Sequence, residues 1–226
     1  MKKWEELPPD MRVPEVRTYY EILKRRRGSL ILKRIFDIIV AGFLLIVLSP
    51  VLVLLSVLIK ADSKGPVFFR QVRVTRYGKT FRIFKFRTMV NNADKIGTQV
   101  TTKGDVRVTR IGKRLRGCRL DELPQLFNIL TGDMTFVGTR PEVEKYVSHY
   151  TNEMKATLLL PAGVTSLASI EYKDEEKLLE SAADADKVYV GKILPEKMKY
   201  NLEAIRKFSF MQDIKTMAAT VIAVIK

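Results

Sequence analysis

The sequence predicts a helix-rich α+β protein that is monotopic, meaning that it enters a membrane from one side and returns. The first observation is an uncharged stretch of 22 residues, Ile38–Ile59, which Ser49 and Pro50 interrupt at its centre. The second is a pair of partly alternating segments between residues 67 and 89, typical of a β-hairpin. Together they predict an N-terminal re-entrant helix-break-helix followed by a small cytosolic domain that carries the hairpin.

Composition narrows the classes of function. The chain has 226 residues, enough for one domain with a sizeable core, and a formal net charge of +15. Such a charge indicates a polyanionic partner: nucleic acid, an acidic membrane face or a phosphorylated substrate. The single cysteine, Cys118, excludes an internal disulfide. The single histidine, His149, argues against catalysis by histidine pairs and against histidine-rich metal sites.

The charge is distributed unevenly along the chain. Residues 60–120 contain 17 Lys and Arg against three acids, whereas residues 121–186 contain five against 13. A solvated basic face accounts for some of these charges, but the asymmetry favours an anion-binding region in the middle of the chain.

The uncharged stretch Ile38–Ile59 is long enough to cross a bilayer core as one helix. Pro50 removes a backbone donor, so the helix must kink or break there. Basic residues flank both ends of the stretch, and positive residues stay cytoplasmic, which favours a hairpin that returns to its own side. A kinked transmembrane helix and a buried core hairpin are the alternatives.

The residues before this stretch read as an amphipathic arm. Residues 16–27 predict a short interfacial helix, with Tyr19, Tyr20, Ile22 and Leu23 towards lipid and arginines at the head groups. The chain therefore divides into an interfacial arm (1–32), a re-entrant membrane hairpin (33–60) and a cytosolic domain (61–226).

In the predicted hairpin, strands at 67–74 and 80–89 are joined by a turn at 77–79. We expect Phe81, Ile83, Phe84 and Phe86 to form its apolar side, whereas the basic side chains point elsewhere (Arg82, Lys85 and Arg87). Because basic and aromatic residues are interleaved here, single-stranded nucleic acid binding stays an alternative. Residues 91–103 read as a loop with a short helix.

Two adjacent acids, Asp121 and Glu122, stand where the basic region ends and an apolar run of helical spacing begins. Either could simply be the N-cap of that helix. The helix terminus would also bind phosphate and lower the pKa of Asp121, so that the carboxylate is available as a nucleophile. The two carboxylates could share a Mg²⁺, while Arg116 and Arg140 neutralise a phosphoryl group.

At these residues the chain resembles the monotopic phosphoglycosyl transferases of the bacterial sugar transferase family. The resemblance is carried by KRIFDI (33–38), Ser49-Pro50, KFRTM (85–89), RxxxxDELPQLFN (116–128), GDMTFVGTRPE (132–142), PAGVTSLASI (161–170) and SFMQDIKT (209–216). It runs from about residue 33 to the C-terminus, and the DELPQ motif in this order is specific.

The resemblance implies transfer of a sugar-1-phosphate from a UDP-sugar to a polyprenol phosphate, with release of UMP. Asp121 would be the nucleophile that forms a phosphosugar-enzyme intermediate, and Glu122 would help to bind Mg²⁺. Substrate or phosphate binding falls on Lys85, Arg87, Arg116, Gln125 and Arg140. Ser49 and Pro50 match the break of a re-entrant hairpin in the cytoplasmic leaflet of the bacterial inner membrane.

One position departs from the family's pattern. Thr139 stands where many members have a proline before the arginine, which we expect to alter loop rigidity and sugar choice. The long multi-helix N-terminal extension of some relatives is not in this sequence, which reads as the small, catalytic-core form. The sequence names neither the sugar nor the pathway, and it leaves a homo-oligomer open.

The distal part is less informative. The acidic residues 171–187 predict a helix, and Asp184 and Asp186 form a weak metal-motif match. Two further helices are predicted at 198–210 and 214–225, with an apolar stripe that packs on the core or lies on the membrane. Two rival functions remain: a non-catalytic membrane-surface protein that binds anionic lipid or nucleic acid, and a conventional glycosyltransferase that releases UDP.

Overall fold

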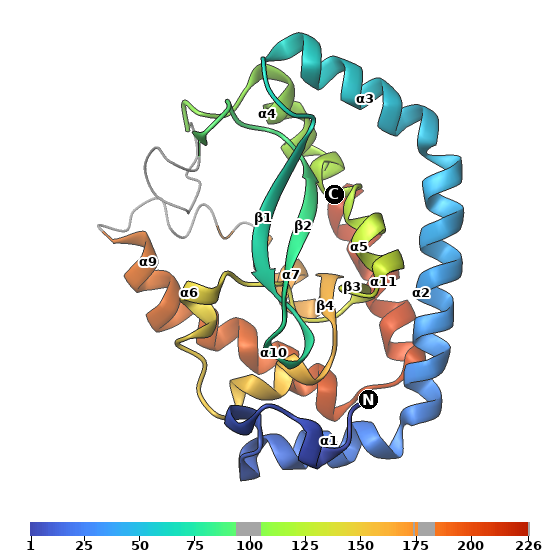
Figure 1. Ribbon diagram of the computed structural model, residues 1–226, viewed down its shortest axis with the longest axis vertical. Helices are drawn as coiled ribbons and strands as arrows, with labels where there is room; N and C mark the ends of the chain where they lie inside the picture. The colour runs from blue at the N-terminus through green and yellow to red at the C-terminus, as the bar shows by residue number, and fades with distance from the viewer. Residues whose placement is uncertain (94–104, 174, 176–183, 226) are drawn as a thin grey trace.

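Helices form most of the chain and two small sheets lie among them in the computed structural model, which describes residues 1–93, 105–173, 175 and 184–225 (Figure 1). This confirms the helix-rich α+β class. The helices are α1 (Pro14–Arg25), α2 (Arg27–Val47), α3 (Ser49–Asp62), α4 (Arg110–Gly117), α5 (Gln125–Thr131), α6 (Glu144–Val147), α7 (Leu167–Glu171), α9 (Ala185–Val188), α10 (Leu194–Arg206) and α11 (Phe210–Ile225). Shorter helical turns are η1 (Trp4–Glu6), η2 (Pro9–Met11), η3 (Arg76–Gly78), η5 (Leu120–Glu122), η6 (Met154–Leu159) and the π-helical η7 (Tyr189–Ile193).

The predicted β-hairpin is confirmed. Strands β1 (Phe68–Val74) and β2 (Thr80–Phe86) pair antiparallel from Phe68 opposite Phe86 to Val74 opposite Thr80. The turn between them places Tyr77 and Gly78 at positive φ. The predicted division into faces was wrong, since strand alternation puts Lys85 on the same face as the buried Phe81 and Ile83, and it puts Phe84 and Phe86 on the opposite face with Arg82.

A second pair of strands was not predicted. Strand β3 (Met134–Val137) pairs in parallel with β4 (Ala162–Thr165), and each has only four residues. Two glycines allow the backbone after β3 to lie directly against β4. A Cβ built on Gly163 would lie 2.2 Å from the backbone nitrogen and oxygen of Gly138. The loop that follows β3 is therefore pressed against β4.

Helices α2 and α3 are separated by a break at the predicted place. No single helix in the described ranges has the length and apolarity to cross a membrane. Helices α2 and α3, which are bent by 62° at their break, reach that length and apolarity only when they are taken together, and this is a statement about length and composition alone. The Ser49 hydroxyl donates to the carbonyl of Ile46 at 2.8 Å. This is the acceptor that the missing N–H of Pro50 leaves without its i→i−4 donor.

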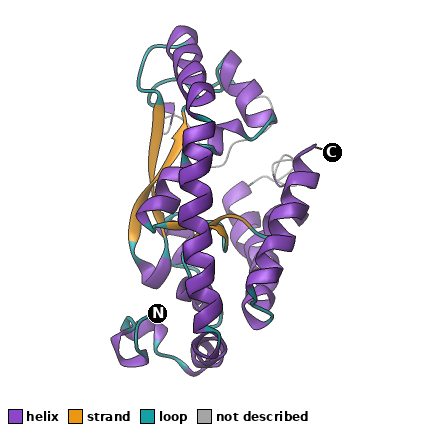
Figure 2. Ribbon diagram, turned by 90° about the vertical axis from the view of Figure 1, so that its right-hand side faces the viewer, coloured by secondary structure: helices purple, strands orange, loops and turns teal. Residues whose placement is uncertain are grey.

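Charged side chains on α2 fasten the bent pair to the rest of the molecule. Lys33 pairs with Asp213 of α11 at 2.6 Å and donates to the carbonyl of Val137 at 2.8 Å. Asp37 accepts the hydroxyl of Thr135 in β3 at 2.6 Å. In Figure 2 the long helix α2 runs vertically in front, with the hairpin strands on one side and the C-terminal helix on the other.

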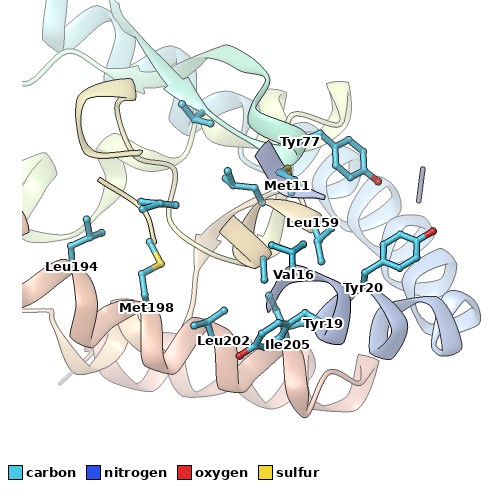
Figure 3. Close-up of a cluster of buried hydrophobic side chains, with 14 of the residues drawn as sticks. Met11, Val16, Tyr19, Tyr20, Tyr77, Leu159, Leu194, Met198, Leu202 and Ile205 are labelled. Atoms are coloured by element: carbon cyan, nitrogen blue, oxygen red, sulfur yellow. The ribbon is translucent and has the colours of Figure 1, made fainter. Parts of the chain in front are cut away.

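The prediction for the lipid-facing side of the N-terminal arm was wrong. Tyr19, Tyr20 and Leu23 are at most 2% exposed and belong to the largest buried cluster, with residues of η6 and α10 (Figure 3). The Tyr19 hydroxyl donates to Glu153 at 2.5 Å, and that of Tyr20 donates to the carbonyl of Lys2 at 3.2 Å. The apolar face of α1 is thus covered by protein.

The C-terminal apolar stripe divides between core and surface. Phe208 is buried, whereas Met211 and Val221 on α11 are more than half exposed. The predicted loop at 91–103 and the predicted acidic helix at 171–187 lie largely outside the described residues. Within the described part, Asp184 caps α9 by accepting from the amide of Lys187, and Asp186 pairs with Lys145 and accepts the hydroxyl of Tyr146.

Candidate active site

The acidic pair lies on a 3₁₀ turn between two helices. Asp121 and Glu122 belong to η5, which starts after Arg119 in a left-handed backbone conformation with φ of 56°. Helix α5 starts only at Gln125, with Pro124 at its N-cap. The reading of either acid as the N-cap was therefore wrong, because the 3₁₀ turn and the proline separate both acids from the helix.

Glu122 is the centre of a three-residue ion cluster. Its Oε1 accepts from Lys85 Nζ at 2.8 Å and from Arg140 Nη2 at 2.7 Å, and its Oε2 is 3.5 Å from Arg140 Nη1. The three residues come from β2, from η5 and from the loop after β3. The structure thus brings together three of the residues that the sequence singled out.

Burial and opposite charges act against each other in this cluster. Burial disfavours the ionised form of Glu122, but Arg140 and Lys85 together hold its pKa well below the ordinary value. Burial lowers the pKa of Lys85, and the charge of Glu122 opposes that effect. The charge of Glu122 raises the pKa of Arg140. Glu122 is therefore an ionised carboxylate with two close cations.

Asp121 has the opposite electrostatic character. It is 8% exposed, and its Oδ1 is buried without a hydrogen-bond partner in the described part of the chain. Burial raises the pKa of Asp121, Lys85 opposes the rise, the charge of Glu122 adds to it, and Arg116 and Arg140 oppose it. The prediction that a helix terminus lowers this pKa was wrong, because Asp121 precedes the helix and desolvation outweighs the neighbouring cations.

The remaining predicted site residues divide into two groups. Arg116, in the last turn of α4, acts on the pKa of Asp121 through its charge, and Gln125 is 2% exposed at the first position of α5. Arg87 lies elsewhere: its buried guanidinium donates to the carbonyls of Ser63 and Lys64, just after α3. The structure therefore gives Arg87 a place in the connection between α3 and β1, not beside the acidic pair.

Asn128 is a site-forming residue that sequence reasoning did not single out, although it ends the DELPQLFN motif. It is 2% exposed on α5, accepts from the amide of Phe84 at 2.8 Å and donates to the carbonyl of Arg82 at 3.1 Å. These two β2 residues lie one position and three positions before Lys85. Asn128 therefore sets the distance between α5 and β2 at which Lys85 reaches Glu122.

The loop that carries Arg140 is held through its backbone. The amide of Gly138 donates to Thr165 and the carbonyl of Thr139 accepts from Gly163, at 3.0 and 2.8 Å. On the other side, Arg73 donates to the carbonyl of Pro141 at 3.1 Å. Because these contacts use backbone atoms of the loop, they do not depend on the side chain at position 139.

Behind this loop, Glu142 is a buried anchor. Its carboxylate accepts the hydroxyl of Tyr189 at 2.6 Å and lies 4.0 Å from Arg73, and its carbonyl accepts from the amide of Val74 at 2.9 Å. The end of β1 and the π-helical turn η7 thereby fix the chain next to Arg140.

The acidic pair could supply two of the oxygen ligands of a magnesium ion. Mg²⁺ prefers oxygen ligands and commonly uses one or two carboxylates together with substrate phosphates and water. Within the described ranges, Asp121 offers a buried oxygen without a partner, and the contact of Glu122 Oε2 with Arg140 is long, at 3.5 Å. No cluster of three or more metal-ligating side chains occurs among the described residues, so the other ligands would come from substrate and water.

Comparison with known proteins identifies the family of the chain. The sequence profile named "Bacterial sugar transferase" matches residues 28–226, and the chain belongs to that family. A Klebsiella pneumoniae protein named UDP-glucose:undecaprenyl-phosphate glucose-1-phosphate transferase is 38% identical over 199 residues, covering 85% of this chain and 40% of its own. An Aeromonas hydrophila protein named UDP-N-acetylgalactosamine-undecaprenyl-phosphate N-acetylgalactosaminephosphotransferase is 36% identical, covering 84% and 43%.

A shorter relative is the Bacillus subtilis protein named putative undecaprenyl-phosphate N-acetylgalactosaminyl 1-phosphate transferase. It is 42% identical over 135 residues, which cover 60% of this chain and 75% of its own. The chain thus spans about two fifths of the length of the Klebsiella and Aeromonas relatives. The arm that precedes residue 28 lies outside the family match.

Proposed function

We propose that this chain transfers a sugar-1-phosphate from a UDP-sugar to a polyprenol phosphate and releases UMP. Family membership and the names of the relatives, which specify UDP-sugars and undecaprenyl phosphate, support the substrate classes. The observation that carries the chemistry is Asp121, a buried carboxylate with an unpartnered oxygen beside a cationic cluster. A carboxylate without hydrogen bonds keeps its lone pairs for attack.

The reaction proceeds in two displacements. In the first, an Asp121 oxygen forms a bond to the phosphorus that carries the sugar, and the bond from that phosphorus to the oxygen bridging the two phosphates breaks. The electron pair of that bond leaves with UMP. In the second, an oxygen of the polyprenol phosphate attacks the same phosphorus, and the bond to Asp121 breaks, which regenerates the carboxylate. Neither displacement requires a net proton transfer.

The cations around the acidic pair have separate tasks. Arg116 and Arg140 stabilise the negative charge of the phosphates, since charge spreads over the phosphoryl oxygens as the bonds exchange. Lys85 balances Glu122, so that the donor does not meet two uncompensated carboxylates. When bound, Mg²⁺ would be held by Asp121 and Glu122 and would neutralise charge on the diphosphate.

The acceptor's chemistry fits a site next to a membrane. We place the bent pair α2–α3 in the cytoplasmic leaflet of the bacterial inner membrane, as a hairpin that enters and leaves on the same side. Many large apolar side chains on this pair are exposed, among them Ile39, Phe43, Ile46 and Val53, each at least 63%. Two displacements would let a water-soluble donor and a lipid acceptor take turns at one site.

The deciding experiment measures the nucleotide released from a panel of UDP-sugars, with polyprenol phosphate and Mg²⁺. We expect UMP from one or a few donors and none from Asp121→Asn. Without acceptor, the wild-type protein should gain the mass of one phosphosugar, and the variant should not.

Other outcomes decide between the rival functions. Release of UDP would overturn the proposal in favour of a conventional glycosyltransferase. Binding to anionic vesicles with no nucleotide released from any donor would favour a membrane-surface binding protein. Unchanged UMP release by Asp121→Asn would remove Asp121 as the nucleophile.

A further inference from the structure

A buried amide close in sequence to the acidic pair has no partner among the described residues. Gln125, the first residue of α5, is 2% exposed, and its Nε2 makes no hydrogen bond within the described residues. Four residues earlier, Oδ1 of Asp121 is in the same condition. One group is a donor and the other an acceptor, so the fold buries two complementary polar groups and leaves both unsatisfied.

Leaving a buried polar group unpaired destabilises the fold, and an apolar side chain at position 125 would avoid that cost. The same short helix shows that an amide can be satisfied here. Asn128 is equally buried, and both ends of its amide bond to β2. The missing partner of Gln125 is therefore specific to its position, and a bound ligand would remove the cost.

We propose that Gln125 is a catalytic residue, whose Nε2–H donates to a non-bridging oxygen of the phosphoryl group that Asp121 attacks. This inference rests on the proposed function. Phosphoryl oxygens are acceptors, which is what an unpartnered N–H requires. Attack brings phosphorus to bonding distance of the Asp121 carboxylate, and Gln125 is only four residues after Asp121 in the chain. No proton is transferred, and the neutral amide adds no charge beside the Lys85–Glu122–Arg140 cluster.

The proposal predicts an unusual combination of effects for Gln125→Met, which keeps the length of the side chain and removes the amide. Its Tm should equal or exceed that of the wild type, because an unpaired buried group is replaced by an apolar one. UMP release in a single turnover should fall about 10²-fold, the loss that follows removal of one donor to a reacting oxyanion.

Asn128→Leu is the matched control, since it removes an equally buried amide from the same helix. It leaves the Phe84 amide and the Arg82 carbonyl unpaired, so its Tm should fall. Both variants and the wild type are compared as full chains in the same detergent, by thermal unfolding and by the mass of the phosphosugar adduct.

Each outcome either supports or overturns the role of Gln125. A maintained Tm with UMP release lowered about 10²-fold supports the proposal. A fall in Tm like that of Asn128→Leu overturns it, because the amide then has a structural partner, and unchanged turnover overturns it as well. If the wild-type protein releases UMP from no donor, the proposed function itself fails, which is a different result from an active wild type and an equally active variant.

Discussion

At the scale of single residues, Asp121 and Glu122 are neighbours in sequence with opposite ionisation behaviour. Glu122 lies between Lys85 and Arg140, whereas the buried oxygen of Asp121 has no hydrogen bond from any residue that the structure describes. Because burial raises the pKa of Asp121, its ionised form destabilises the folded chain. A carboxylate kept in this state is reactive at a cost in stability, as is common for functional sites.

This predicts that Asp121→Asn stabilises the free protein near neutral pH. A carboxyl whose folded pKa is raised contributes stability that is complete below its unfolded pKa, about 3.9, and is lost as pH rises through the folded pKa. The uncharged asparagine avoids that loss. The Tm of the variant should therefore exceed that of the wild type at pH 7.5, and the difference should shrink as pH falls towards 4.

Thermal unfolding of both proteins between pH 4 and 8, without substrate or Mg²⁺, checks this. Glu122→Gln is the contrasting variant, because Glu122 has a lowered pKa and stabilises the fold above its unfolded pKa. Its Tm should be below that of the wild type at pH 7.5. A lower Tm for Asp121→Asn at pH 7.5 would contradict the assigned cause of the shift.

At the scale of elements, local patterns predicted the hairpin and the helix break but not the parallel sheet. Alternation of apolar residues locates β1 and β2, and a proline inside an apolar run locates the bend. Strands β3 and β4 have four residues each and no alternation, and their pairing joins segments whose backbones approach closely at Gly138 and Gly163. Such pairing is decided by tertiary contact, which a local pattern does not contain.

The close backbone approach predicts that Gly163→Ala is severely destabilising. A Cβ at 2.2 Å from Gly138 must push the backbone after β3 away, and that backbone carries Arg140 to Glu122. We expect a loss of several kcal/mol, in the range of overpacked or strained sites, and loss of UMP release. Urea unfolding measures the first effect.

Gly191→Ala is the matched control for this substitution. It adds the same methyl group in a helical turn where nothing lies within 4 Å, so stability should be unchanged or slightly higher. Equal effects of the two substitutions would show that the contact between Gly138 and Gly163 is not tight.

At the scale of the whole molecule, the site is assembled from segments that are distant in sequence. Lys85 and Arg140 are 37 and 18 residues from Glu122. The sequence identified each of them as a candidate but could not predict that all three meet, or that Arg87 bonds elsewhere. The ion pair between Lys85 and Glu122 depends on how Asn128 packs α5 against β2, and no local sequence pattern predicts that contact.

The N-terminal arm shows a second limit of the sequence. The spacing of Val16, Tyr19, Tyr20 and Leu23 on α1 predicts an apolar helix face, but a lipid surface and a protein core would both cover such a face. The structure places all four side chains inside the largest buried cluster. Although it lies outside the family match, the arm is thus part of the core of this chain.

This predicts that Leu23→Ala lowers the free energy of unfolding by about 2–5 kcal/mol, the usual cost of a cavity at a fully buried leucine. Leu32→Ala, on the 49% exposed Leu32 of α2, is the control and should cost less than about 1 kcal/mol. Urea unfolding in detergent compares the two. Equal, small effects would mean that Leu23 faces lipid or detergent.

The bend between α2 and α3 leads to a prediction about topology. With 62° between the two helices and basic residues at both ends, a hairpin in one leaflet keeps both ends on the side of the domain, whereas a kinked crossing separates them. Single cysteines at the exposed positions Lys24 and Lys64, introduced with Cys118→Ser, test this in sealed vesicles. A third cysteine at exposed Lys79, on the β-hairpin, marks the side of the domain. We expect a membrane-impermeant maleimide to label all three from the same side, since a crossing would protect Lys24→Cys whenever Lys64→Cys and Lys79→Cys react.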